Sequence, residues 1–304
     1  YAELFPGMTT NFINVAVGGT GISERDGTPG NFWVDLTNPN APADGPLLVA
    51  AAATIAARDG DMSQPQIGAI FWDHGQNSAN YVDAPDAPNV AFTRKMYVDA
   101  TVYALTRLRA MIGSNGPIIF QRLGRARRPV VSEWRWQIIR EAQLDVVAAL
   151  SGAHVGPETW DLPYKDNLHP DSWGQYHIGI RMAEALAQVR GASGITGPLS
   201  ITAAAYNAAG RYIDVTLNGS PLRFTDPQGF AVFDASGNRI NIARIHWAST
   251  TAARLFLEAE ATGGTLYYGW GIIEIADDRL IPRRSQSPSV VTLAQPIRPS
   301  RHQL

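Results

Sequence analysis

Three segments of the sequence combine residue types that together could carry out acyl transfer. They span residues 17–21, 72–78 and 166–170, and each follows an apolar run or precedes a helical pattern. An α/β fold binds its ligands at such positions, where strands end and helices begin. The sequence therefore predicts that these loops, although far apart in the chain, form one site.

Each segment has a distinct chemical use. Glycine in Gly18-Gly19 lets the backbone approach a substrate closely and present an N–H group. The side-chain amide of Asn77 can donate a hydrogen bond to a developing oxyanion. Asp166 and His169 can place a carboxylate against one imidazole nitrogen, which leaves the other nitrogen free to act as a general base on a hydroxyl.

Taken singly, the same residues have ordinary structural roles. A Gly-Gly pair is most often a tight turn, an Asn often caps a helix, and a lone His usually lies on the surface. Residues 18–21 lack the spacing and the lysine of a phosphate-binding loop. His74 could hold a metal ion with Asp73, but the six histidines form no H-x-x-x-H pair, so no metal site is predicted.

The elements that must position these loops follow from the apolar patterns. Strands are expected at 11–17, 67–72, 117–120 and 153–160, and helices at 46–58, 91–112, 132–150 and 171–189. Because strands and helices alternate, we expect parallel βαβ units in a three-layer α/β/α sandwich. Such a sheet would bring the chemical segments to one edge.

The pattern changes near residue 195. Short β-like runs separated by turn signals follow, at 212–217, 231–233, 254–258 and 265–268. We therefore predict an α/β domain at 1–194 and an all-β sandwich of about 100 residues at 195–304. The tail from Pro282 onward is expected to lie extended on the surface.

The chemical segments resemble signature blocks of the SGNH (GDSL-like) hydrolases, especially the branch that removes acetyl groups from carbohydrates. Gly18-Gly19-Thr20 is similar to the glycine block, Gly75-Gln76-Asn77 to the Gly-x-Asn block, and Asp166-Asn167-Leu168-His169-Pro170 to the Asp-x-x-His block. Arg140-Glu141-Ala142-Gln143 and Trp173-Gly174-Gln175 are also typical of the family. The resemblance covers residues 1–190 and implies a flavodoxin-like parallel sheet.

The resemblance also implies the roles of these residues. The protein would be a serine esterase, an O-acetylesterase for a carbohydrate or glycan, without metal or organic cofactor. His169 would be the base and Asp166 would orient it, while Gly19 N–H and the Asn77 side chain would form the oxyanion hole. The residues expected to contact substrate are Gly18, Thr20, Gly75, Gln76, Trp72 and His74. One of Trp72, Trp160 and Trp173 could stack on a sugar ring.

The sequence departs from the family at the nucleophile. The family's Ser stands in a Gly-x-Ser turn after a strand that precedes the glycine block, and residues 1–8 contain neither a serine nor a strand pattern. That strand would lie between 11–17 and 67–72, so we expect a strand from outside residues 1–190 in this slot. Three explanations stay open: an upstream fragment carries the strand and the Ser, a second polypeptide or a rearranged part of this chain supplies them, or the site is degenerate.

Serines within the chain are weaker candidates. Ser220 follows a strand pattern as Asn218-Gly219-Ser220, but the next residues do not begin a helix, so a hairpin turn is the better interpretation. Ser23 and Ser78 stand near the predicted site, although in other blocks. The alternative function is a non-catalytic glycan-binding surface or virion-tail module on a degenerate esterase scaffold.

Composition limits the possible partners and locations. The 304 residues are 45% hydrophobic and 17% charged, and the formal net charge of −2 predicts no general attraction to nucleic acid. Cysteine is absent, which excludes disulfides but leaves the compartment open. No apolar run reaches the ~18 residues that a membrane span needs. We expect an acetylated glycan substrate and favour an extracellular, periplasmic or virion-surface location.

Overall fold

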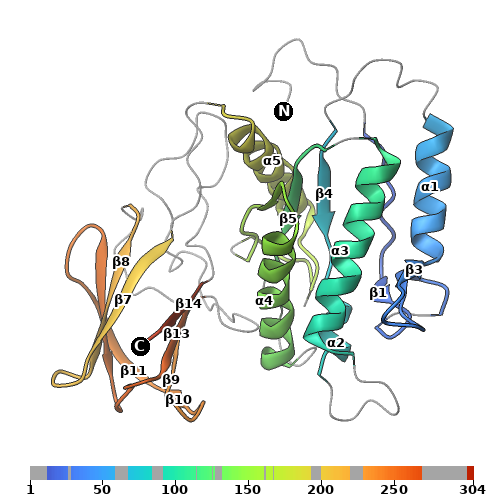
Figure 1. Ribbon diagram of the computed structural model, residues 1–304. Coiled ribbons are helices and arrows are strands. Elements are labelled where there is room, and N and C mark those ends of the chain that lie inside the picture. Colours follow the sequence, from blue (N-terminus) through green and yellow to red (C-terminus); the bar gives the residue numbers. More distant parts are fainter. Residues whose placement is uncertain are drawn as a thin grey trace. The chain divides into compact units, whose positions relative to one another are not determined.

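The chain folds into two units, each assembled from separate stretches of sequence (Figure 1). The first contains residues 1–123, 129–156 and 179–192, and the second contains 124–128, 157–178 and 193–304. The computed structural model describes residues 12–26, 29–58, 68–83, 92–113, 115–124, 126, 132–160, 162–166, 168–192, 200–219, 229–268 and 300–304. The predicted boundary between 194 and 195 lies outside these described residues.

A parallel sheet in the order β4-β5-β6 lies in the first unit. Its strands are Ile70–Asp73, Ile118–Gln121 and Ala153–Val155. β5 is buried along its whole length, which suits the apolar, β-branched run of a central parallel strand. These strands correspond to the ones predicted at 67–72, 117–120 and 153–160.

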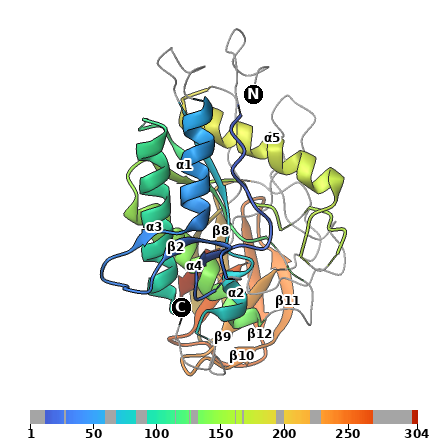
Figure 2. The same cartoon turned by 90° about the vertical axis from the view of Figure 1, so that its right-hand side faces the viewer.

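The long helices match the segments that the sequence predicts. They are α1 (Pro46–Arg58), α3 (Arg94–Met111), α4 (Glu133–Ala149) and α5 (Ser172–Val189). α3 begins at the cap Thr93, whose side chain accepts a hydrogen bond from Met96 N. α3 packs against both α1 and α4, and the views in Figures 1 and 2 show α1 and α3 side by side.

A small mixed sheet, which we did not expect from the sequence, follows the glycine segment. β1 (Gly21–Ser23) pairs in parallel with β2 (Phe32–Asp35), and β2 pairs antiparallel with β3 (Ala43–Asp44). α1 and α3 pack on β2. This sheet fixes the chain between the glycine segment and the first long helix.

The strand predicted at 11–17 is wrong for the part that the structure describes, because residues 12–17 form no strand. Phe12 and Val17 are exposed. Among the described residues, β4 pairs only with β5, so its other edge has no partner strand. An apolar run becomes a strand where a neighbour supplies ladder hydrogen bonds, and residues 12–17 have no such neighbour in the described chain. The three-layer sandwich stays a prediction.

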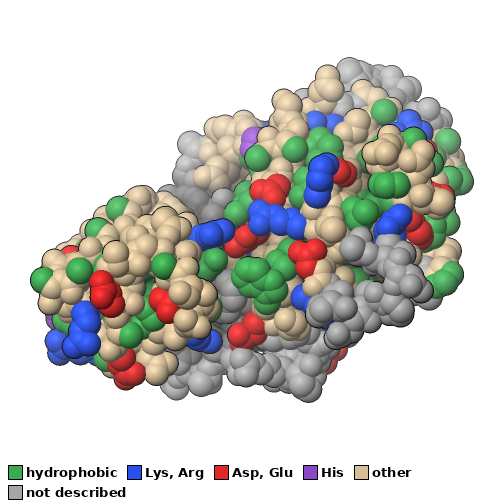
Figure 3. Space-filling model, turned by 60° about the horizontal axis from the view of Figure 1, so that its bottom comes forward, with side chains coloured by type: hydrophobic (Ala, Val, Ile, Leu, Met, Phe, Trp, Pro, Cys, Tyr) green, Lys and Arg blue, Asp and Glu red, His purple; other side chains and the backbone are tan. Residues whose placement is uncertain are grey.

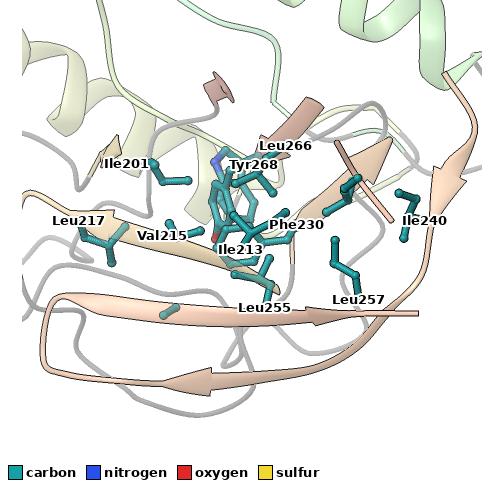
Figure 4. Close-up of a cluster of buried hydrophobic side chains, with 14 residues drawn as sticks. Ile201, Ile213, Val215, Leu217, Phe230, Ile240, Leu255, Leu257, Leu266 and Tyr268 are labelled. Carbon is teal, nitrogen blue, oxygen red and sulfur yellow. The ribbon is translucent and has the colours of Figure 1, made fainter. Parts of the chain in front are cut away.

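The second unit contains two antiparallel sheets, in the orders β11-β12-β8-β7 and β10-β9-β13-β14. Their strands are β7 (Ile201–Asn207), β8 (Tyr212–Leu217), β9 (Phe230–Phe233), β10 (Arg239–Ile240), β11 (Ile242–Trp247), β12 (Ala252–Leu257), β13 (Thr265–Tyr268) and β14 (Ser300–Gln303). Figure 4 shows side chains of both sheets in one buried cluster, with Val215 and Leu255 from the first sheet and Leu266 and Tyr268 from the second.

Of the tail that is expected to lie extended on the surface, the structure describes residues 300–304. Residues 300–303 form the edge strand β14, which pairs with β13 through Ser300 to Gln303. Residues 269–299 lie outside the described part of the chain. The strand forms because β13 offers a free edge after pairing with β9.

The surface carries both signs of charge close together, as Figure 3 shows for one face. Arg94 of α3, for example, bridges Glu141 and Asp145 of α4 at 2.9 and 2.7 Å. Within the described residues, no helix has the length and hydrophobicity to cross a membrane.

Candidate active site

Asp166 and His169 form the hydrogen-bonded pair that their spacing predicts. His169 Nδ1 lies 2.9 Å from Asp166 Oδ2 and 3.0 Å from Oδ1. Both side chains are about half exposed. Among the described residues no partner bonds to Nε2, so the geometry leaves this nitrogen able to accept a proton.

The backbone around Asp166 sets the charge of this carboxyl group. Its Oδ1 accepts hydrogen bonds from Leu168 N and His169 N, each at 2.8 Å. These backbone donors, followed by the His169 side chain, hold the pKa of Asp166 well below its ordinary value. Asp166 is therefore ionised wherever an imidazole base is neutral, and it can stabilise the imidazolium that forms when His169 takes a proton.

Hydrogen bonds on both sides close the loop that carries the pair. Lys165 N donates to His169 O at 3.0 Å, and Asp171 N donates to Pro163 O at 3.1 Å. Tyr164 and Pro170 form an isolated antiparallel bridge. These bonds hold the loop like a short hairpin, which keeps the carboxylate of Asp166 and the imidazole of His169 next to each other.

The glycine segment presents an open backbone in the first unit. Gly19 has φ +69°, a conformation that favours glycine, and no atom lies within 4 Å of the position that a Cβ would take. Its carbonyl accepts a hydrogen bond from Asn31 Nδ2 at 3.0 Å. Within the described chain no acceptor is bonded to Gly19 N–H, as an oxyanion donor requires. Thr20 is buried, and its carbonyl lies 3.2 Å from His74 Nε2.

Gly75 begins the loop after β4 at a position where no side chain fits. Its φ is +135°, and an added Cβ would lie 2.9 Å from Ile139 Cγ2 and 3.1 Å from Tyr97 Oη. Tyr97 Oη and Gln143 Nε2 donate to the carbonyl of His74, at 3.0 and 2.8 Å. α3 and α4 therefore hold this loop in place through side chains.

Gln143, the last residue of the motif Arg140-Glu141-Ala142-Gln143, has a clear structural role. Its Nε2 bonds the loop after β4, and its Oε1 accepts a hydrogen bond from Leu123 N, just after β5, at 2.9 Å. One buried amide therefore ties together the chain segments that follow two neighbouring strands. A buried amide bonded at both ends is a positioning device, and Gln143 was noted in the sequence only by resemblance.

A network around Asp26 was missed at the level of sequence. Ser78 Oγ donates to Asp26 Oδ2, and Asn77 Nδ2 donates to the Asp26 carbonyl. Ser23 N donates to Asp26 Oδ1 at 2.7 Å. Burial raises the pKa of Asp26 to about 6, against the opposing effect of the hydrogen bonds that Ser78 and Ser23 donate to its carboxyl group. Asp26 thereby fixes the side chain of Asn77, whose amide keeps a second hydrogen for another acceptor.

Two predicted substrate contacts are buried instead. Trp72 packs edge-on against Trp33, with ring centroids 5.1 Å apart. Burial lowers the pKa of His74 to about 4, so the ring is neutral and donates through Nε2 to Thr20 O. Direct contact of these side chains with substrate stays a prediction, as it does for Gln76. In the described part of the chain, no three His, Asp or Glu side chains gather as metal ligands.

The predicted site residues fall in both units. Gly18 to Thr20 and Gly75 to Asn77 belong to the first, and Asp166 and His169 belong to the second. Convergence of Gly19 N and the Asn77 amide beside His169 stays a prediction. Ser220 lies outside the described residues.

Comparison with known proteins shows a similarity of fold. No protein-family model and no curated protein matches the chain. A solved structure of a carbohydrate acetylesterase from Xanthomonas citri matches 79% of the chain, with a TM-score of 0.54 and 18% identity. The chain shares its fold with that enzyme. It covers 51% of the acetylesterase chain, about half of that protein's length.

Proposed function

We propose that this protein is a serine esterase of the SGNH type that removes acetyl groups from a carbohydrate. The observation that carries the proposal is the contact of His169 Nδ1 with both oxygens of the ionised Asp166. The fold shared with a carbohydrate acetylesterase supports the acetyl-carbohydrate substrate.

The chemistry is acyl transfer in two steps. His169 Nε2 takes the proton of a serine hydroxyl as its oxygen attacks the acetyl carbonyl, and Asp166 stabilises the imidazolium. Gly19 N–H and the second hydrogen of the Asn77 amide are the proposed donors to the oxyanion. His169 then protonates the departing sugar oxygen, and water hydrolyses the acetyl-serine by the same route.

The nucleophile is proposed to come from a strand that pairs with the edge of β4. That edge has no partner among the described residues, and Phe71 of β4 is exposed, as are Phe12 and Val17. Bare edges with exposed apolar side chains favour the addition of a strand. An upstream segment of a longer polypeptide or a second polypeptide could supply it with its Ser.

Two serines near the site do not fit the nucleophile's role. Ser78 and Ser23 are fully buried, and the hydroxyl of each bonds to Asp26. A buried hydroxyl that donates to a carboxylate cannot reach an ester without breaking that bond. The nucleophilic Ser is therefore proposed to be neither Ser23 nor Ser78.

The test is acetate release from acetylated xylan by the protein expressed from its complete coding sequence. H169A should lower kcat/KM by about 10²- to 10⁴-fold, because a general base supplies that much of the rate. H246A removes an exposed histidine of β11 and is the matched control, expected to retain activity. Equal rates for H169A and the wild type would contradict the proposal.

The alternative is a non-catalytic glycan-binding module. It is favoured by one observation: in the described part of the chain, no serine hydroxyl bonds to His169. A protein that binds the acetylated glycan but releases no acetate, and that no serine-directed phosphonate labels, would support this alternative.

A further inference from the structure

Two aromatic side chains on the first turns of α5 form a packed and exposed pair. Trp173 is 53% exposed and Tyr176 is 58% exposed. Their ring centroids are 5.7 Å apart, and the ring planes differ by 24°. His177 is buried and contacts both rings edge-on, with centroid distances of 4.4 and 5.5 Å. The two rings are stacked, and His177 packs edge-on against both, so these contacts restrict the rotation of both side chains.

Among the tryptophans considered for sugar stacking, only Trp173 is exposed to solvent. Trp72 and Trp160 are buried in the cores of their units. Exposed single apolar residues are common, but an ordered pair of large rings leaves apolar area in water that a ligand would cover. The pair is therefore a candidate binding surface.

The start of α5 is fixed to the loop that carries His169. Asp171 Oδ1 accepts a hydrogen bond from Gly174 N at 2.7 Å, and Asp171 O accepts one from Gln175 N at 2.8 Å. A Cβ at Gly174 would lie 2.6 Å from Pro163 O and 2.9 Å from Pro170 Cβ. Glycine thus allows the helix to pack directly on this loop, so the rings and the base belong to one local structure.

The residue types in the first turns of α5 favour an uncharged ligand. Residues 172–178 are Ser-Trp-Gly-Gln-Tyr-His-Ile and include no Lys or Arg. A nucleic acid strand also stacks on aromatic rings, but it needs cations along its phosphates. A pyranose ring offers a face of weakly positive C–H groups, which suits the negative face of an aromatic ring, while its hydroxyls stay in water.

We propose that Trp173 and Tyr176 form a stacking platform for a neutral pyranose unit of the substrate chain. The proposal rests on the proposed function for the identity of the substrate as a carbohydrate. The pyranose unit on the platform would be a different sugar of the same glycan chain from the acetylated one, because Trp173 follows the base His169 by only four residues. Binding energy gained there serves the positioning of the ester.

The test measures binding of xylohexaose and cellohexaose, which carry no acetyl group, by calorimetry. W173A should weaken the binding of the oligosaccharide by about 10-fold, the loss of one stacked ring, and W173F should retain most of the affinity. W134A is the matched control, because Trp134 of α4 is 57% exposed but lies on another helix. Thermal unfolding of each variant checks that the fold is kept.

The outcomes separate this proposal from the esterase proposal. Binding that depends on Trp173 without any acetate release would support the platform and reject the esterase. Equal affinity of W173A and the wild type would overturn the platform, as would the absence of binding to either oligosaccharide. Loss of a dimer in W173A, without oligosaccharide binding by the wild type, would assign the rings to self-association and also overturn it.

Discussion

Asp166 and Asp26 each contact a residue of the proposed site, and their surroundings shift their pKa values in opposite directions. Asp166 is half exposed and bonded by backbone N–H groups, which lowers its pKa. Asp26 is buried, and the loss of water raises its pKa to about 6 although several groups donate to it. The first stays charged to support a base, and the second holds neighbouring side chains in place.

The buried Asp26 should make stability depend on pH. The ordinary pKa of an Asp carboxyl group is 3.8, and that of Asp26 in the folded protein is about 6, so between these values the folded protein holds a proton that the unfolded chain has lost. Stability from this group therefore falls as pH rises through this window. Relative to D26N, the wild type should lose about 2–3 kcal/mol of unfolding free energy between about pH 4 and pH 7. Urea unfolding at several pH values measures it, and a constant difference would contradict the assignment.

The sequence could predict the local pair and not the network. Asp166 and His169 are three residues apart, so one turn of chain decides their contact. Ser78 and Asp26 are separated by 52 positions, and their hydrogen bond depends on how two loops meet. No pattern within either loop reports that meeting. Family-like residues such as Gln143 marked the region, but only the structure shows what Gln143 bonds.

At the scale of elements, helices were predicted well because their signal is internal. α1 occupies the predicted 46–58, since its alanine-rich composition and its Pro46 start lie within the segment itself. Strands depend on neighbours, so the apolar run at 12–17 is not a strand where the described chain offers no partner. β1, β2 and β3 have two to four residues each, too short for a period to appear.

Trp160, which precedes the Asp–His pair, anchors its loop to the core of the second unit. Trp160 is fully buried in the core between the two antiparallel sheets, and its ring lies edge-on to Tyr268 at 5.7 Å. Figure 4 shows Tyr268 beside Phe230 in this core. The segment that carries Asp166 and His169 therefore gains its stability from the β-sheets of the second unit.

Removal of this anchor should be costly. W160A should lower the unfolding free energy by about 3–5 kcal/mol, the usual loss when a buried Trp is truncated to Ala. W173A, which removes an exposed Trp of the same unit, should change it by less than about 0.5 kcal/mol. Urea unfolding curves provide both values. Similar midpoints for the two variants would show that Trp160 does not hold the core together.

At the scale of the whole molecule, the two units are interleaved in sequence. The chain leaves the first unit after Leu123 and again after Gly156, and α5 begins in the second unit and ends in the first. A composition change near residue 195 marks the start of the strand-rich region but cannot show that 157–178 packs with it. The second unit of the structure therefore includes residues that lie before the change in composition.

This interleaving predicts the behaviour of a chain cut after Ala192. Such a chain keeps Trp160, Asp166 and His169 but loses β7 to β14, the strands that bury Trp160. Residues 157–178 should then exchange their amide hydrogens rapidly, because an exposed indole no longer holds the loop. α4 and β5 should stay protected, since their partners lie in the first unit. Hydrogen exchange followed by mass spectrometry compares the cut and full chains. Equal protection of 157–178 in both would show that this segment is stable without the β-sheets, and that the strands serve a purpose other than holding the proposed base.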